Sequence, residues 1–208
     1  MIRPENIATA AFGGAADGDP RSDSATRRRL SASLGIPDAW AWMRQVHGSA
    51  VVRADGAGEL GEADAIYTMT PGLPLAVATA DCFPVVLAGS GAIGLAHAGW
   101  RGAASGVVES LCDAMSAAGA RPSHAAIGPG IRSCCFEVGP NVTERFAGFA
   151  STTDWGTPSV DLAASVGSAL SGLDLWASGE CTMSGSGYHS YRRDGTDERQ
   201  VAVAWLQD

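Results

Sequence analysis

The segment from Ala78 to Gly102 (ATADCFPVVLAGSGAIGLAHAGWRG) places one cysteine and one histidine at breaks in apolar, glycine-rich sequence. The apolar runs on either side of Cys82 predict two short strands, and a third run predicts a strand that ends at His97. A helix is predicted directly afterwards, from Arg101 to Ala118. Because rigid scaffolds present functional side chains at strand ends, we expect Cys82 and His97 to face one cleft.

A third candidate ligand lies upstream, in the segment Trp40 to Arg53 (WAWMRQVHGSAVVR). This segment predicts two strands around a turn at Gly48-Ser49, with His47 just before the turn. Two histidines and one cysteine make a three-ligand set for zinc that leaves the fourth tetrahedral position for water or substrate. The three residues are too far apart in sequence for a compact zinc finger, so folding must assemble the site.

The same three residues also suit other chemistry. Cys82 as nucleophile, with His47 or His97 as base, would make a Cys–His hydrolase, and sequence spacing does not separate this from a metal site. A blue-copper centre also uses two histidines and a cysteine, but neither Met43 nor Met183 has an evident place as its axial ligand. A full multicopper oxidase needs many histidines, and the chain has four.

Charged residues near these motifs are candidates for substrate or phosphate binding. Arginine binds anions through paired N–H groups, and the nearest arginines are Arg44, Arg101 and Arg192. Asp81, which directly precedes Cys82, is the acidic candidate. For each arginine, a salt bridge or a solvated side chain is the alternative interpretation.

Length and charge limit the class of protein. A chain of 208 residues, 46% hydrophobic, predicts one domain over residues 1–208. The formal net charge of −8 argues against a nucleic-acid surface, so we expect small-molecule partners and a monomer. The sequence contains neither a signal-peptide pattern nor an apolar run of about 18 residues. We therefore expect a cytoplasmic protein with no membrane contact.

The five cysteines are an odd number in a chain large enough to fold without disulfides, so reduced thiols are expected. No CxxC pair occurs, which excludes a zinc ribbon or a thioredoxin-like motif. Cys134 and Cys135 follow a glycine-rich turn. They either approach the candidate site or pack as two buried thiols.

Strands come in a run before helices interleave with them, which favours an α+β domain with mixed sheets over a doubly wound fold. Residues 1–21 predict at most one short strand, near residues 7–12. The remaining predicted helices cover residues 22–34 with Ser22 or Ser24 as N-cap, residues 141–150 with Asn141 as N-cap, and residues 161–170 with Asp161 as N-cap. Later strands are predicted at residues 124–128, 173–182 and 199–206.

Six short segments, taken in order, resemble the YfiH-like laccase-domain family. The resemblance covers roughly residues 42–206. The segments are Arg44–Gly48 (RQVHG), Ala63–Ala65 (ADA), Ala80–Pro84 (ADCFP), His97–Gly102 (HAGWRG), Gly128–Ile131 (GPGI) and Ser190–Gly195 (SYRRDG).

The resemblance implies a four-layered α/β/β/α fold with mixed sheets, and zinc bound by His47, Cys82 and His97. It implies phosphorolysis of adenosine, inosine and methylthioadenosine together with adenosine deamination. The family is named for polyphenol oxidase activity, for which copper is the alternative metal, and some bacterial relatives are described as peptidoglycan editing factors. Three segments depart from the family pattern: Ala11–Ala16 (AFGGAA), the Gly/Ser-rich segment after Cys181, and Thr196–Gln200 (TDERQ). Specificity can therefore differ, and residues 1–21 form a variable N-terminal segment.

Three hypotheses follow. The first is a zinc-dependent purine nucleoside phosphorylase with adenosine deaminase activity, in which His47, Cys82 and His97 are ligands and catalytic residues. The second is a Cys82-dependent hydrolase acting on a peptidoglycan precursor. The third is a non-enzymatic protein in which the triplet holds structural zinc.

Overall fold

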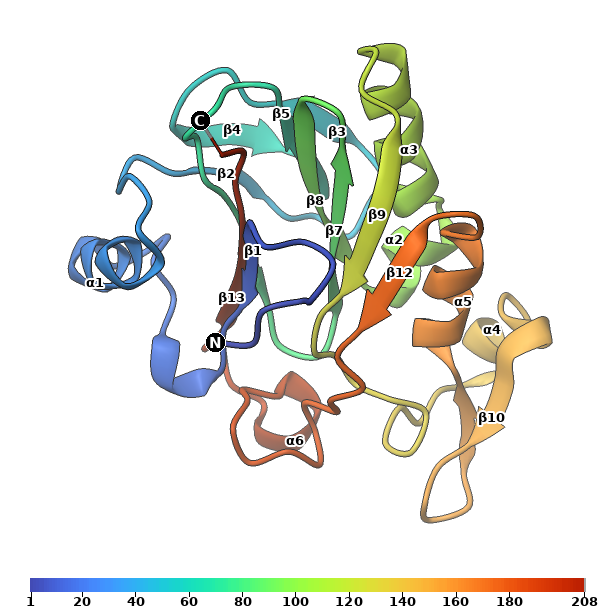
Figure 1. The fold of residues 1–208 in the computed structure, drawn as a ribbon. Helices are drawn as coiled ribbons and strands as arrows, with labels where there is room; N and C mark the ends of the chain where they lie inside the picture. The colour runs from blue at the N-terminus through green and yellow to red at the C-terminus, as the bar shows by residue number, and fades with distance from the viewer. Residues whose placement is uncertain (208) are drawn as a thin grey trace.

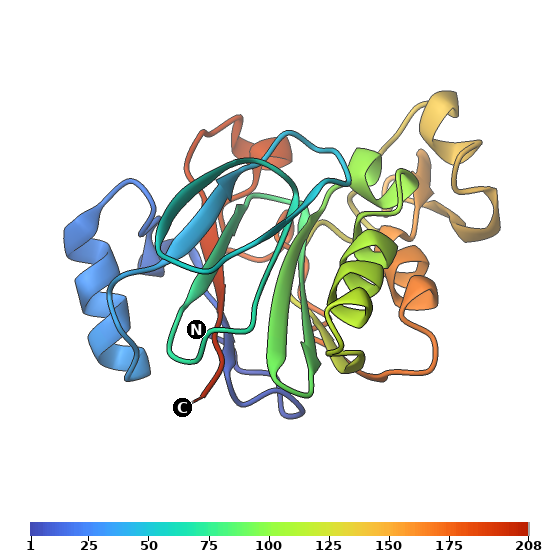
Figure 2. The same cartoon turned by 90° about the horizontal axis from the view of Figure 1, so that it is seen from above.

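The structure is a computed structural model that describes residues 1–207. Two β-sheets pack face to face, and helices cover the outer face of each sheet (Figures 1 and 2). Within the described residues the first sheet has the order β1 (Ala10–Phe12), β13 (Gln200–Ala204), β6 (Leu75–Thr79), β2 (Ala41–Arg44) and β4 (Gly58–Glu62). The second has the order β12 (Asp174–Ala177), β9 (Pro122–Ile127), β7 (Phe83–Gly89), β8 (Ala92–Ala98), β5 (Ala65–Thr68) and β3 (Val51–Arg53).

Both sheets are mixed. In the first, β13 runs antiparallel to β1 and β6, while β2 runs parallel to β6 and β4. In the second, β7, β8, β9 and β5 pair antiparallel, and parallel strands β12 and β3 form the two edges. The α+β class with mixed sheets is therefore confirmed.

Helices make the outer layers. On one side lies α1 (Ser24–Leu34), and on the other lie α2 (Trp100–Ala104), α3 (Val107–Ala117) and α5 (Leu162–Ala169) (Figure 2). The shorter elements are η1 (Ala15–Asp17), α4 (Pro140–Thr143), η2 (Ala147–Phe149), α6 (Tyr191–Asp194) and the hairpin of β10 (Ala150–Thr152) with β11 (Pro158–Val160). The α/β/β/α order is thus confirmed. Among the described residues, no helix combines the length and apolar character needed to cross a membrane.

The core follows from the alternation of side chains along the strands. In β7, Val85 and Leu87 pack toward α3, while Val86 between them packs toward the first sheet. Phe12 of β1 is also buried between the two sheets. Because every residue of β8 is buried, this strand lies at the centre of the molecule and fixes the position of the residues at its end.

Some element boundaries differ from the sequence prediction. The helix predicted from Arg101 to Ala118 is broken at Gly106, whose φ of 75° lies in the left-handed region. The N-cap of α1 is Asp23, which accepts from two backbone N–H groups, rather than Ser22 or Ser24. In place of the helix predicted at residues 141–150, the structure has two short helices, α4 and η2. By contrast, α5 and its Asp161 cap are confirmed.

Candidate active site

Three successive connections lead from the first sheet to the second and meet beside the end of β8. The connection from β2 to β3 carries His47, that from β4 to β5 carries Asp64, and that from β6 to β7 carries Cys82. His97 is the penultimate residue of β8. The fold thus brings together residues that are far apart in the sequence.

The ligand atoms of His47, Cys82 and His97 all lie within 4.8 Å of one another. Cys82 Sγ is 4.0 Å from His47 Nε2, and the two imidazole rings meet edge to face with centroids 4.7 Å apart. His97 is buried, Cys82 is half-buried and His47 is exposed. The three residues therefore form one cluster with an open side.

Asp64 organises this cluster, although its sequence position alone does not predict a role for it. Its carboxylate is fully buried and lies 2.8 Å from His97 Nδ1. It also accepts backbone N–H groups of Val46, His47 and Gly48 at 3.2, 2.9 and 2.6 Å. A carboxylate bonded to Nδ1 orients the ring of a ligating histidine and leaves Nε2 for the metal. An acidic residue between two alanines at the start of an apolar strand was the available signal.

Two residues of the site have strained backbones. His47 has a φ of 63° and Asp81 a φ of 90°, values that are uncommon outside glycine and cost on the order of 1 kcal/mol each. The three bonds from Asp64 hold the turn at His47. Surrounding hydrogen bonds must hold the Asp81 backbone in the same way.

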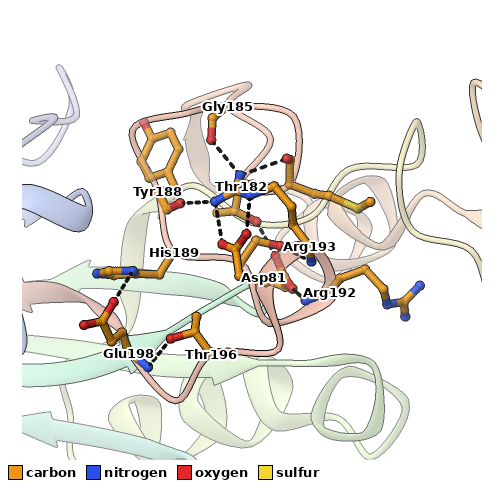
Figure 3. Close-up of polar contacts among 12 residues, drawn as sticks. Asp81, Thr182, Gly185, Tyr188, His189, Arg192, Arg193, Thr196 and Glu198 are labelled. Carbon is orange, nitrogen blue, oxygen red and sulfur yellow. Dashed lines mark hydrogen bonds and ion pairs between the residues drawn. The ribbon is translucent and has the colours of Figure 1, made fainter.

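Asp81 anchors the C-terminal loop to the site, as Figure 3 shows. Its carboxylate accepts the hydroxyl of Thr182 and the backbone N–H of Arg192, both at 2.7 Å. Its carbonyl accepts the N–H of Ile131 at 2.8 Å. The guanidinium of Arg193 donates to four carbonyls of the same loop, those of Thr182, Met183, Gly185 and Tyr188. Asp81 therefore fixes the loop that follows β12.

Charges within the cluster support one another. Burial opposes ionisation of Cys82, but the charge of His97 and hydrogen bonds from both histidines lower the pKa of Cys82 to about 6. Burial likewise opposes protonation of His97, but Cys82 and Asp64 raise the pKa of His97 to about 9. Burial would also raise the pKa of Asp64, yet its bonds to His97 and to the turn hold it below the usual range. The lowered pKa of Cys82 and the raised pKa of His97 both favour a thiolate–imidazolium pair.

The cluster lies in a cavity of about 660 Å³. Of the predicted binding residues, Arg44, Asp81 and Arg192 line this cavity. Arg101 does not occur among the described residues that line it, and its guanidinium lies over the Trp100 ring at 4.3 Å. The cavity is also lined by residues that were not predicted from the sequence as binding residues: Arg21, Trp42, Gln45, Phe136, Tyr191 and Arg199.

The arginines of the cavity differ in their partners. Arg21 donates hydrogen bonds to the side chains of Asp19 and Gln45. The Gln45 side chain in turn forms two hydrogen bonds with the backbone of Ala78. Arg44 pairs with Glu62 at 3.1 Å, and both side chains are exposed. Arg192 donates from Nη1 to the Glu137 carbonyl at 2.7 Å and lies 5.4 Å from the Phe136 ring centre.

The donor set fits a metal ion. Two imidazole nitrogens and one thiolate suit zinc, and copper accepts the same donors. Gly99 allows the close approach of the ligands, because a Cβ there would lie 2.7 Å from Cys82 Sγ and 3.2 Å from His47 Cδ2. The backbone at Gly99 therefore lies so close to Cys82 Sγ that a larger residue at this position would displace the sulfur.

Comparison with known families adds a second line of evidence. The model of a family described as multi-copper polyphenol oxidoreductase laccase matches residues 4–207. A purine nucleoside phosphorylase of Streptomyces griseus is 41% identical over 94% of this chain and 86% of its own length. A purine nucleoside phosphorylase of Deinococcus radiodurans is 42% identical over 90% of this chain and 79% of its own length.

Solved structures agree with the fold. YlmD from Geobacillus stearothermophilus superposes with a TM-score of 0.83 at 26% identity, over 100% of this chain and 98% of its own. The YfiH protein of Bacillus licheniformis superposes with a TM-score of 0.81 at 27% identity, over 88% of this chain and 80% of its own. The resemblance drawn from the six sequence segments is confirmed.

Proposed function

This chain belongs to the multi-copper polyphenol oxidoreductase laccase family, and we propose that it is a zinc-dependent purine nucleoside phosphorylase that also deaminates adenosine. The observation that carries the proposal is the presence, in one cavity, of a His–Cys–His cluster together with arginine side chains. The relatives named purine nucleoside phosphorylase support it, since they align over at least 90% of this chain.

The cavity offers the groups that a nucleoside and a phosphate require. Its volume of about 660 Å³ is in the range of small-molecule sites. Phe136 and Tyr191 line it and provide aromatic faces for a purine. Arg44 and Arg192 provide N–H groups for a phosphate dianion. Adenosine, inosine and methylthioadenosine are the proposed substrates.

His47, Cys82 and His97 would hold the zinc ion. When bound, zinc supplies a Lewis acid that can polarise the purine or a water molecule beside it. Asp64 keeps His97 oriented with Nδ1 engaged, and the bonds of Asp64 to the turn hold His47 in place. The ligands are therefore positioned before metal binds.

In phosphorolysis, a phosphate oxygen forms a bond to C1′ of the ribose while the bond from C1′ to the purine nitrogen breaks. The arginines hold the phosphate close to C1′, and the aromatic residues hold the base, so that both reactants share one orientation. The departing purine nitrogen takes a proton from solvent or from a cavity residue. In deamination, water adds to the amino-bearing carbon of adenine and ammonia leaves.

The cellular location and the oligomeric state of the protein are also proposed. We place the protein in the cytoplasm as a monomer, where nucleosides and phosphate are both present. Size-exclusion chromatography of the purified chain tests the monomer.

The direct test is chromatography of the products formed from adenosine, with and without phosphate. Zinc-loaded wild type is compared with Cys82→Ala prepared in parallel, which controls for contaminating host enzymes. We expect adenine only when phosphate is present, inosine in either condition, and neither product from the variant. If zinc-loaded wild type yields no product, the nucleoside proposal is wrong and the Cys82-dependent hydrolase of a peptidoglycan precursor takes its place.

A further inference from the structure

A second cluster of sulfur atoms lies outside the cavity just described. The thiol sulfurs of Cys134, Cys135 and Cys181 all lie within 4.8 Å of one another. Cys134 Sγ is 3.0 Å from Cys135 Sγ and 3.7 Å from Cys181 Sγ. All three are free cysteines; Cys135 is buried, and the other two are half-buried. Two segments far apart in sequence therefore converge on one point through their thiols.

Backbone hydrogen bonds fix both segments. The turn that carries Cys134 and Cys135 is closed by bonds from the N–H groups of Cys135 and Phe136 to the Arg132 carbonyl, each 2.9 Å long. Cys181 forms a parallel bridge with Gly130, and the N–H of Thr182 donates to the Gly130 carbonyl at 3.1 Å. The sulfurs are thus held near one another by the main chain.

Packing alone does not account for the cluster. Cys135 packs into the core beneath the second sheet, as a small apolar residue would. Cys181, however, accepts the backbone N–H of Arg132 at 3.4 Å. Cys134 and Cys181 also contact this core, yet their sulfurs lie only 3.7 Å apart. The three sulfurs therefore lie against one another as well as against the core.

We propose that Cys134, Cys135 and Cys181 form a second metal site, which binds one monovalent copper ion through three sulfurs. A thiolate lies about 2.3 Å from the metal it binds, so two sulfurs on one ion are about 4 Å apart. Two of the observed separations, 3.0 Å and 3.7 Å, are shorter than that value, and the third is at most 4.8 Å. Small rotations of the side chains would bring all three sulfurs onto one ion.

The donor set selects the class of metal. Soft thiolates favour Cu(I), zinc and iron–sulfur clusters over hard cations. Structural zinc and iron–sulfur sites use four protein ligands, and zinc held by three protein ligands, as proposed for the first site, keeps a fourth position for water. The cluster found among the described residues has three sulfurs, one buried and two half-buried. Three thiolates complete the coordination of a Cu(I) ion.

The site is separate from the nucleoside cavity but connected to it. None of the three cysteines occurs among the described residues that line the cavity. Thr182, which follows Cys181, donates to Asp81, the residue before Cys82. A metal ion at the three cysteines would therefore rigidify the loop that Asp81 anchors.

The test measures Cu(I) bound by the full chain in the Cys82→Ala background, which removes the sulfur of the first site. Cu(I) is supplied from a bicinchoninate buffer under anaerobic, reducing conditions. We expect about one equivalent of Cu(I) in this background and none after Cys134→Ser together with Cys181→Ser. The matched control is Cys112→Ser, a half-buried cysteine of α3 that should leave the bound equivalent in place.

Two results would overturn the proposal. One is an equal Cu(I) content in the double variant and the Cys112→Ser control. The other is zinc binding at the cluster with no Cu(I) bound. If the double variant does not fold, X-ray absorption of the Cu(I)-loaded Cys82→Ala protein decides: three sulfur neighbours support the site, and nitrogen or oxygen neighbours reject it.

Discussion

The carboxylate of Asp64 lies 2.8 Å from Nδ1 of His97 and has no exposed surface. The same carboxylate holds the turn that carries His47 through three backbone N–H groups. One buried side chain thus orients two of the three candidate metal ligands. The geometry of the cluster depends on a residue that is not itself a ligand.

Asp64→Asn should weaken both the metal site and the fold. Asparagine keeps one acceptor oxygen but presents an NH₂ group to neighbouring donors, which costs about 1–3 kcal/mol of unfolding free energy. The affinity for zinc should fall about 10- to 100-fold, because His97 loses its orienting partner. Zinc competition with a chromophoric chelator measures the affinity, and thermal denaturation measures the stability. Asp55→Asn, in an exposed pair with Arg53, is the control and should change neither quantity. A zinc affinity unchanged in Asp64→Asn would refute the orienting role.

The alkylation of Cys82 should follow an unusually low pH midpoint in the metal-free protein. Only the thiolate reacts with iodoacetamide, so the rate should be low below pH 6 and reach its plateau above it, since the pKa of Cys82 is lowered to about 6. His97→Gln removes the positive charge that favours the thiolate, so the midpoint should rise. Cys112, whose pKa is raised by burial and by Asp113 and Glu109, serves as the internal reference. Mass spectrometry of the labelled peptides gives both profiles, and coincident profiles would contradict the ion pair.

Gly99→Ala should disturb the ligands with little change in the rest of the fold. The backbone of Gly99 is extended, with a φ of −78°, so alanine is tolerated locally. Its Cβ, however, would lie 2.7 Å from Cys82 Sγ and must displace it. A displacement of about 1 Å can cost about 100-fold in activity. Adenosine phosphorolysis is the measurement, and Gly56→Ala, with no atom within 4 Å of the added Cβ, is the matched control. Equal activity of the two variants would show that the sulfur position is not critical.

Arg192→Gln should raise the KM for phosphate by about tenfold, the loss expected for one charge-assisted hydrogen bond. The anchoring bond to Asp81 survives because it comes from the backbone N–H of residue 192. Arg44→Gln should have a smaller effect, since Arg44 is exposed and paired with Glu62. Arg53→Gln, at another exposed ion pair, is the control. Initial rates at varied phosphate give the KM values, and a lower kcat with an unchanged KM would place Arg192 outside the phosphate site.

Local patterns in the sequence were sufficient to identify the three clustered residues. Cys82 and His97 lie at breaks in apolar strands and His47 lies before a turn, and each of these positions is confirmed. The sequence does not show which strands share a sheet. Strands β2, β4 and β6 pair in one sheet, while the strand that follows each of them pairs in the other. These crossings bring His47, Asp64 and Cys82 together. The contacts of Asp64 with His97 and with the turn at His47 therefore depend on the folded chain.

Of the remaining differences from the prediction, two come from long-range contacts and one is local. Cys181 joins Cys134 and Cys135 through a bridge between Gly130 and Cys181, which no local pattern indicates. Gly106 is a residue that commonly interrupts a helix, but the apolar periodicity on both sides of it favours one continuous helix. Strand β4, Gly58–Glu62, has neither β-branched residues nor clear alternation, so its pairing with β2 decides its structure.

The most direct measurement is the rate of adenine formation from adenosine and phosphate as zinc is added to metal-free protein. We expect wild type to gain activity up to about one equivalent of zinc and then to reach a plateau, whereas Cys82→Ala should stay at the baseline throughout. Full activity in the metal-free wild type, or equal activity of the variant at saturating zinc, would contradict a zinc-dependent site at His47, Cys82 and His97.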